Sequence, residues 1–133
     1  MRGIVLADTG PLYAARDPDD THHRRSQDQL THLKDANLKV VEPYPILLES
    51  YSLVMHKLGN REAHILINEV ASTSILKNAT PEDYQDASDI VLRYADQDMT
   101  LFDTVLAAMS VRLEAPVWTF DHHFDVMSVE VWR

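Results

Sequence analysis

The chain has 133 residues, 45% of them hydrophobic and 25% charged, which is enough for one domain with its own hydrophobic core. It has no cysteine, which excludes disulfide bonds, thiolate zinc sites and a cysteine nucleophile. Its net charge of −9, from 21 acidic and 12 basic residues, argues against a broad basic surface for nucleic acid.

Short apolar runs alternate along the chain with helix-like patterns. The first strand is predicted at residues 4–8, where an apolar run without alternation indicates a strand covered on both faces. Further strands are expected at residues 38–41, 74–77, 116–119 and 126–131. A helical turn is expected at 12–15, and helices at 22–37, 46–58, 61–71, 80–95 and 101–113. This order predicts a single α/β domain over residues 1–133, with a mostly parallel central sheet flanked by helices.

Two acidic residues end predicted strands. Asp8 ends the first strand, and Asp121 ends the later one, two residues after Thr119. Ligands of open parallel sheets gather beyond the carboxyl ends of the strands, so neighbouring parallel strands would bring these carboxylates to one edge. Each residue also has a purely structural interpretation, Asp8 as a helix cap and Asp121 as a turn residue.

Three more acidic residues lie in or next to predicted helices. Glu49 lies early in the helix at 46–58, while Asp98 and Asp103 flank the start of the helix at 101–113. Glu49 could instead be a solvated helix residue. Asp103 could complete a capping box with Thr100.

Converging carboxylates would raise one another's pKa and destabilise the site unless a counter-charge is present. A hard divalent cation with oxygen ligands is the simplest counter-charge, and Mg²⁺ or Mn²⁺ fits best. Such a cation can activate a water molecule and stabilise a phosphoryl transition state. The acidic residues therefore predict a metal site if the fold brings them together.

The order of these motifs resembles that of PIN-domain ribonucleases over essentially the whole chain. Residues 4–9, Ile-Val-Leu-Ala-Asp-Thr, and 45–49, Pro-Ile-Leu-Leu-Glu, resemble the family's opening. Residues 98–108 resemble its Asp-led helix, and the Thr-Phe-Asp-x-x-Phe motif at 119–124 is the most specific match. The length is similar to that of the single-domain VapC-type toxins.

This resemblance implies a PIN-like three-layer fold and a metal-dependent ribonuclease activity. It implies that Asp8, Glu49, Asp103 and Asp121 are the catalytic acids that hold Mg²⁺ or Mn²⁺. Thr9 and Thr119 match hydroxyl positions that support the site, and Asp98 matches an auxiliary acid. For a VapC-type protein it also implies an RNA substrate, a small antitoxin partner and a homodimer.

The chain departs from the family pattern in two ways. Thr104 stands where the family's helix motif has alanine, and few basic residues remain to contact RNA. The candidates for phosphate contact are Arg16, Arg24 and Arg25, which a solvated surface explains equally well. The acidic charge also fits a chain that binds no nucleic acid, or one that a basic partner covers.

Two other functions fit the sequence less well than a nuclease. Asp8-Thr9-Gly10 also matches the triplet of aspartic proteases, but those enzymes are all-β. A PIN-like module that binds RNA or protein without catalysis would be expected to lack one of the catalytic acids, and all are present. The adjacent pairs His22-His23 and His122-His123 are expected to point apart and to form no shared ligand face.

The sequence has no apolar run of the ~18 residues that a membrane span needs and no signal-peptide core. We therefore expect a cytoplasmic protein without a membrane partner.

Overall fold

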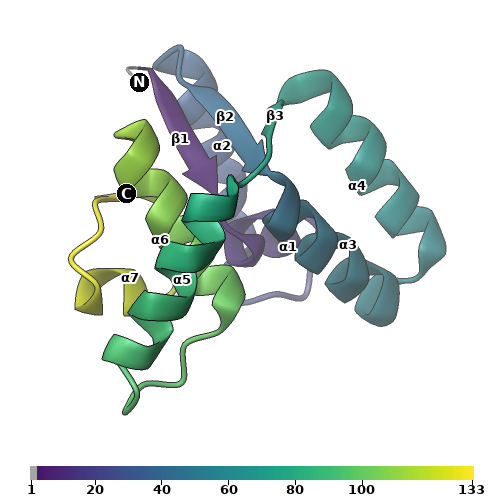
Figure 1. Ribbon diagram of the computed structural model, residues 1–133. Helices are drawn as coiled ribbons and strands as arrows, with labels where there is room; N and C mark the ends of the chain where they lie inside the picture. The colour runs from purple at the N-terminus through teal and green to yellow at the C-terminus, as the bar shows by residue number, and fades with distance from the viewer. Residues whose placement is uncertain (1–2) are drawn as a thin grey trace.

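A parallel five-stranded sheet runs through the computed structural model, which describes residues 3–133 (Figure 1). Its strands are β1 (Ile4–Ala7), β2 (Lys39–Pro43), β3 (Ile75–Lys77), β4 (Val117–Trp118) and β5 (Val131–Trp132), in the spatial order β3-β2-β1-β4-β5. All four strand pairings are parallel, which confirms the predicted sheet type. Met1 and Arg2 of the predicted domain lie outside the described residues.

Seven helices connect the strands within residues 3–133. They are α1 (Thr9–Arg16), α2 (His23–Asp35), α3 (Tyr44–Leu58), α4 (Asn60–Thr73), α5 (Pro81–Arg93), α6 (Leu101–Leu113) and α7 (His123–Val126). In Figure 1, α5, α6 and α7 lie together, while α3 and α4 form a helical hairpin that extends away from the sheet. None of the helices described is both long and apolar enough to cross a bilayer.

The two faces of the sheet bury separate clusters of apolar side chains. On one face, Leu6 and Val117 pack with Leu106 and Met109 of α6 and with Phe124 of α7. The opposite face packs Val5, Ala7 and Trp118 against Leu33 of α2. Because successive residues of a strand point to opposite faces, the fully apolar β1 serves both clusters. The result is the predicted three-layer arrangement of helix, sheet and helix.

Local sequence signals explain where the helices begin. Thr80 and Asp83 form a reciprocal capping box at the start of α5, and Thr100 and Asp103 form another at α6. Gly59, with φ of +93°, separates α3 from α4 in a conformation that glycine adopts at little cost.

Several local predictions are wrong. Of the strand expected at residues 126–131, only Val131 is in a strand, because the buried Phe124 holds a short helix, α7, ahead of a two-residue β5. The apolar spacing of the helix at 80–95 predicts a stripe that includes Tyr84 and Ala87; Ala87 is buried as expected, but Tyr84 is 48% exposed and Asp83 is buried. The helical turn expected at 12–15 is a full helix that begins at Thr9. Strand β2 runs on to Pro43, two residues beyond its predicted end.

Candidate active site

Asp8 stands at the carboxyl end of the central strand β1. Its backbone N–H donates to the Trp118 carbonyl at 3.0 Å, which ties it to the neighbouring strand β4. Its carboxylate caps α1 by accepting the Thr9 N–H at 2.8 Å, and it also accepts the Thr119 hydroxyl at 2.7 Å. The side chain is only 6% exposed. The capping role weighed for Asp8 is therefore real, and it leaves the carboxylate rigidly placed at the sheet edge.

Thr9 links the first strand to helix α3. Its hydroxyl donates to Oε1 of Glu49 at 2.5 Å and lies 2.9 Å from the hydroxyl of Ser50. Since a hydroxyl carries one proton, the Ser50 hydroxyl donates to Thr9 when Thr9 donates to Glu49. Ser50 is fully buried and was not identified from the sequence, where a serine in mid-helix carries no distinctive signal.

Asp103 occupies the first turn of α6. Its Oδ2 accepts the Thr100 N–H at 2.9 Å, and its own N–H donates to the Thr100 hydroxyl at 3.2 Å. The capping box was one of the two interpretations open for Asp103, and the structure shows it. It also fixes the direction of the carboxylate.

Asp121 follows β4 and is tied to the same network by Thr119. The Asp121 N–H donates to the Thr119 hydroxyl at 2.9 Å, and that hydroxyl donates onward to Asp8. Oδ1 of Asp121 accepts the backbone N–H of His123 at 2.9 Å. Thr119 is 4% exposed, so it acts as a buried connection between two acidic residues.

These side chains border one cleft of about 430 Å³, which we call the acidic cleft. It is lined by Asp8, Thr9, Gly10, Glu49, Asp98, Thr100, Asp103, Phe120 and Asp121. The fold thus brings together all five acidic residues that the sequence singled out, from four separate parts of the chain. Thr119 lies directly behind the lining, through its hydrogen bond to Asp8.

Three carboxylates of the acidic cleft, those of Asp8, Glu49 and Asp103, are destabilised as anions. Burial raises the pKa of Asp8 to about 7, against the hydrogen bonds from Thr119 and Thr9, and the charges of Asp103 and Glu49 raise it further. Burial and the charge of Asp103 raise the pKa of Glu49. Burial and the charge of Asp121 raise the pKa of Asp103. A cation placed among these groups would remove the repulsion.

The donor set fits a hard divalent cation. Carboxylate and hydroxyl oxygens line the acidic cleft, and these are the ligands that Mg²⁺ and Mn²⁺ prefer. Among the residues lining the cleft there is no lysine, arginine or histidine to neutralise the acids. The residues present therefore suit the metal that the resemblance implies.

Glu42 is a buried acid that the sequence analysis missed. It is 0% exposed, and neither carboxylate oxygen has a hydrogen-bond partner among residues 3–133. Burial, and secondarily the charge of Asp8, raises its pKa well above the ordinary value for glutamate. The apolar pair Val40-Val41 could have indicated that Glu42 is buried, because the strand that contains this pair continues through Glu42.

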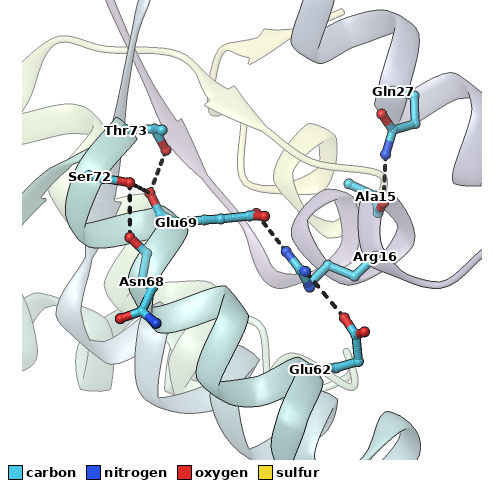
Figure 2. Close-up of polar contacts among 8 residues, drawn as sticks. All are labelled: Ala15, Arg16, Gln27, Glu62, Asn68, Glu69, Ser72 and Thr73. Carbon is cyan, nitrogen blue, oxygen red and sulfur yellow. Dashed lines mark hydrogen bonds and ion pairs between the residues drawn. The ribbon is translucent and has the colours of Figure 1, made fainter.

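Arg16 does not approach the acidic cleft. It forms ion pairs with Glu69 at 2.6 Å and Glu62 at 3.2 Å, both on α4 (Figure 2). It lines a separate cavity of about 660 Å³ between α1, α2 and α4. The predicted phosphate contact by Arg16 is therefore not supported.

Arg25 is the basic residue that the fold brings to the edge of the cleft. Its guanidinium carbon lies 4.7 Å from the ring centroid of Phe120, which lines the cleft. His22 packs on the same ring with centroids 4.8 Å apart. Arg24 is exposed on the same helix.

The expectation that His122 and His123 point apart is wrong. Their ring centroids lie 4.3 Å apart. One ring nitrogen of His122, one ring nitrogen of His123 and one carboxylate oxygen of Asp121 all lie within 4.8 Å of one another. Both residues lie where the backbone turns into α7, with His122 in helical conformation at the N-cap and His123 as its first residue.

No protein-family model matches the sequence, and no curated protein matches it. Solved structures do match. VapC20 of Mycobacterium tuberculosis, a toxin that cleaves the sarcin–ricin loop, has a TM-score of 0.86 at 16% identity, over 97% of this chain and 98% of that chain. VapBC2 from Rickettsia felis, solved with a DNA fragment from its promoter, has a TM-score of 0.71 at 11% identity, over 98% and 97%. FitAcB from Neisseria gonorrhoeae has a TM-score of 0.66 at 17% identity, over 97% and 96%. The chain therefore has the PIN-like α/β fold of these proteins.

Proposed function

We propose that this chain is a metal-dependent endoribonuclease that hydrolyses RNA phosphodiester bonds, acting in the cytoplasm as the toxin of a type II toxin–antitoxin pair. One observation carries the proposal: Asp8, Glu49, Asp103 and Asp121 come from different elements and line one cleft. Burial and mutual repulsion raise the pKa of three of them. Such a cluster is typical of a site that holds a divalent cation for chemistry.

Asp8, Glu49, Asp103 and Asp121 would hold Mg²⁺ or Mn²⁺, which supplies an activated water and charge stabilisation for phosphodiester hydrolysis. Thr119 and Thr9 keep Asp8 and Glu49 in place by donating one hydrogen bond to each carboxylate. Such supporting hydroxyls orient the ligands. Asp98 is exposed at the edge of the cleft, where an auxiliary acid would stand.

RNA is the substrate that the neighbouring fold and the cleft edge support. VapC20 cleaves the sarcin–ricin loop, and its fold matches this chain over nearly its full length. At the edge of the acidic cleft, Arg25 and the ring of Phe120 offer a cation for phosphate and a surface for a base. A local patch of this kind reconciles RNA binding with the net charge of −9.

An antitoxin partner follows from the same comparison. VapBC2 is a complex that binds promoter DNA, and its fold matches that of this chain. An acidic toxin would bind a basic antitoxin through complementary charge. Such a partner would account for the net charge of −9, which RNA binding alone does not explain. We also propose a homodimer, on the resemblance to VapC-type toxins.

Cleavage of a mixed RNA pool in Mn²⁺ tests the proposal, with wild type and Asp8→Asn compared. We expect cleavage by the wild type alone, abolished by EDTA. Asp89→Asn is a matched control, because Asp89 is an exposed acid on α5 outside the acidic cleft. Equal cleavage by wild type and Asp8→Asn would contradict the proposed site. RNA binding without cleavage in every variant would favour the non-catalytic module.

A further inference from the structure

Three consecutive side chains gather metal-ligand atoms beside the acidic cleft. Nδ1 of His123 lies 3.0 Å from Oδ1 of Asp121, and Nδ1 of His122 lies 3.7 Å from the same oxygen. One ligand atom from each residue lies within 4.8 Å of the other two. Two atoms bound in tetrahedral geometry to one Zn²⁺ ion at about 2.0–2.2 Å are themselves roughly 3.3–3.6 Å apart. The spacing is thus near that of ligands that share one ion.

The backbone fixes this arrangement before any ion binds. The His123 N–H donates to Oδ1 of Asp121 at 2.9 Å, which folds the chain back on the carboxylate. Phe124, fully buried in the core, anchors the turn that follows. The His123 side chain is only 13% exposed, so its ring is held by packing, whereas His122 is 75% exposed.

Nδ1 of His123 is buried, and no hydrogen bond satisfies it within residues 3–133. It lies 3.0 Å from Oδ1 of Asp121 without forming a hydrogen bond to it. Leaving a buried polar nitrogen unpaired destabilises the folded protein. A cation between the two atoms would use the lone pairs of both.

We propose that Asp121, His122 and His123 bind a divalent transition-metal ion of the Zn²⁺ class. Imidazole nitrogen favours Zn²⁺, Ni²⁺ or Cu²⁺ over Mg²⁺, so this site differs in chemistry from the all-oxygen acidic cleft. Three protein ligands leave a position open for water or another ligand. The two sites share Asp121, which lines the acidic cleft.

Sharing Asp121 gives the site a regulatory consequence, which rests on the proposed nuclease function. An ion held by the histidines takes Asp121 away from the Mg²⁺ or Mn²⁺ ligands. Zn²⁺ therefore inhibits RNA cleavage in Mn²⁺. Halving the cleavage rate of the His122→Ala variant takes a higher Zn²⁺ concentration than halving that of the wild type.

Metal binding tests the proposal directly, on untagged protein freed of metal. Zn²⁺ titration by calorimetry is paired with Co²⁺ titration, where visible absorption reports nitrogen ligation. We expect wild type to bind one Zn²⁺, His122→Ala to bind it at least about tenfold more weakly, and the double variant His122→Ala/His123→Ala to lose it. His64→Ala is the matched control, because His64 is exposed on α4 and packs on Tyr51 instead.

Wild-type affinity in the double variant would overturn the proposal, as would a wild type that binds no Zn²⁺. Because His122 is 75% exposed, His122→Ala keeps the fold, and its affinity decides the question if His123→Ala unfolds the chain. Asp8→Asn separates the two proposals, since it removes a ligand of the acidic cleft and leaves both histidines. Zn²⁺ binding with no RNA cleavage by any variant would refute the nuclease and support this site. RNA cleavage without histidine-dependent Zn²⁺ binding would support the nuclease and refute this site.

Discussion

The hydroxyl of Thr119 donates a hydrogen bond to Oδ2 of Asp8 at 2.7 Å, across 111 residues of sequence. The contact exists because β1 and β4 are parallel neighbours in which Ala7 pairs with Trp118, so the residue after each strand emerges at one edge. The same hydroxyl accepts the Asp121 N–H at 2.9 Å. One side chain thereby sets the positions of two acidic residues of the cleft.

Thr119→Val should weaken the site without unfolding the chain. Valine keeps the shape of threonine but can neither donate to Asp8 nor accept from Asp121. Loss of such a supporting contact typically costs about 10–100-fold in metal affinity or activity. Mn²⁺ affinity and RNA cleavage are the measurements, and Thr119→Ser should restore most of both. Thr31→Val on α2 is a matched control that should leave both unchanged, since the Thr31 hydroxyl only contacts a carbonyl of its own helix at 3.3 Å.

The stability of the metal-free protein should fall as pH rises. The pKa of Asp8 is raised from 3.8 to about 7, so the folded state binds a proton that the unfolded state releases within this range. The stabilising effect of that proton is fully present below pH 3.8 and is lost as pH rises through about 7. Asp8 accounts for on the order of 4 kcal/mol of this loss.

Asp8→Asn should therefore be more stable than wild type at pH 8 without metal, and the difference should shrink toward pH 4. Urea unfolding at a series of pH values measures it. A metal-free Asp8→Asn protein that is less stable than wild type at pH 8 would mean that the Asp8 carboxylate is not strained in the folded state.

Adding Mn²⁺ should reverse this loss of stability at pH 8. A ligand at 100 times its dissociation constant adds about 2.7 kcal/mol when it binds only the folded state. The thermal midpoint should rise with Mn²⁺ in wild type and in Asp89→Asn, but not in Asp103→Asn. An equal rise in Asp103→Asn would place the Mn²⁺ site elsewhere.

Glu42→Gln should raise stability at neutral and alkaline pH. Since burial raises the Glu42 pKa, the stabilising effect of its bound proton is lost as pH increases. Glutamine has the same shape and never ionises, so its advantage in thermal midpoint should grow with pH. A lower midpoint for Glu42→Gln at pH 8 would show that Glu42 is ionised and paired.

Arg25→Ala should reduce RNA cleavage mainly through KM. The guanidinium stacks on Phe120 at the edge of the cleft, which suits it to hold a phosphate beyond the scissile bond. Its loss should also reduce the dependence of RNA affinity on salt by about one unit of slope. Arg24→Ala, on the same helix, is the matched control. Equal effects of the two substitutions would indicate general attraction by charge.

Much of the fold was predictable because its signals are local. The apolar run at the start of the chain identified a strand buried on both faces. The helix starts predicted near residues 80 and 101 agree with α5 and α6, which Thr80 and Thr100 cap. Strand alternation with helices then predicted a parallel sheet, and its edge gathers the acidic residues in one cleft. Their roles as metal ligands and catalytic groups stay predictions.

The errors arose where tertiary packing decides. Tyr84 matched the periodicity of an apolar stripe, but the buried side of α5 carries Asp83, which the guanidinium of Arg112 contacts at 2.8 Å. Arg16 was sequence-adjacent to the site, yet its position at the end of α1 directs it to Glu62 and Glu69. The sequence next to Tyr84 and Arg16 does not indicate which way either side chain points in the fold.

The most direct test of the account is a crystal of the chain grown with Mn²⁺, with diffraction recorded at the manganese absorption edge. The account predicts an anomalous peak in the acidic cleft, in contact with carboxylate oxygens of Asp8, Asp103 and Asp121. A chain saturated with Mn²⁺ that shows no peak there, or a peak only at other residues, would contradict the central claim that these carboxylates form a metal site.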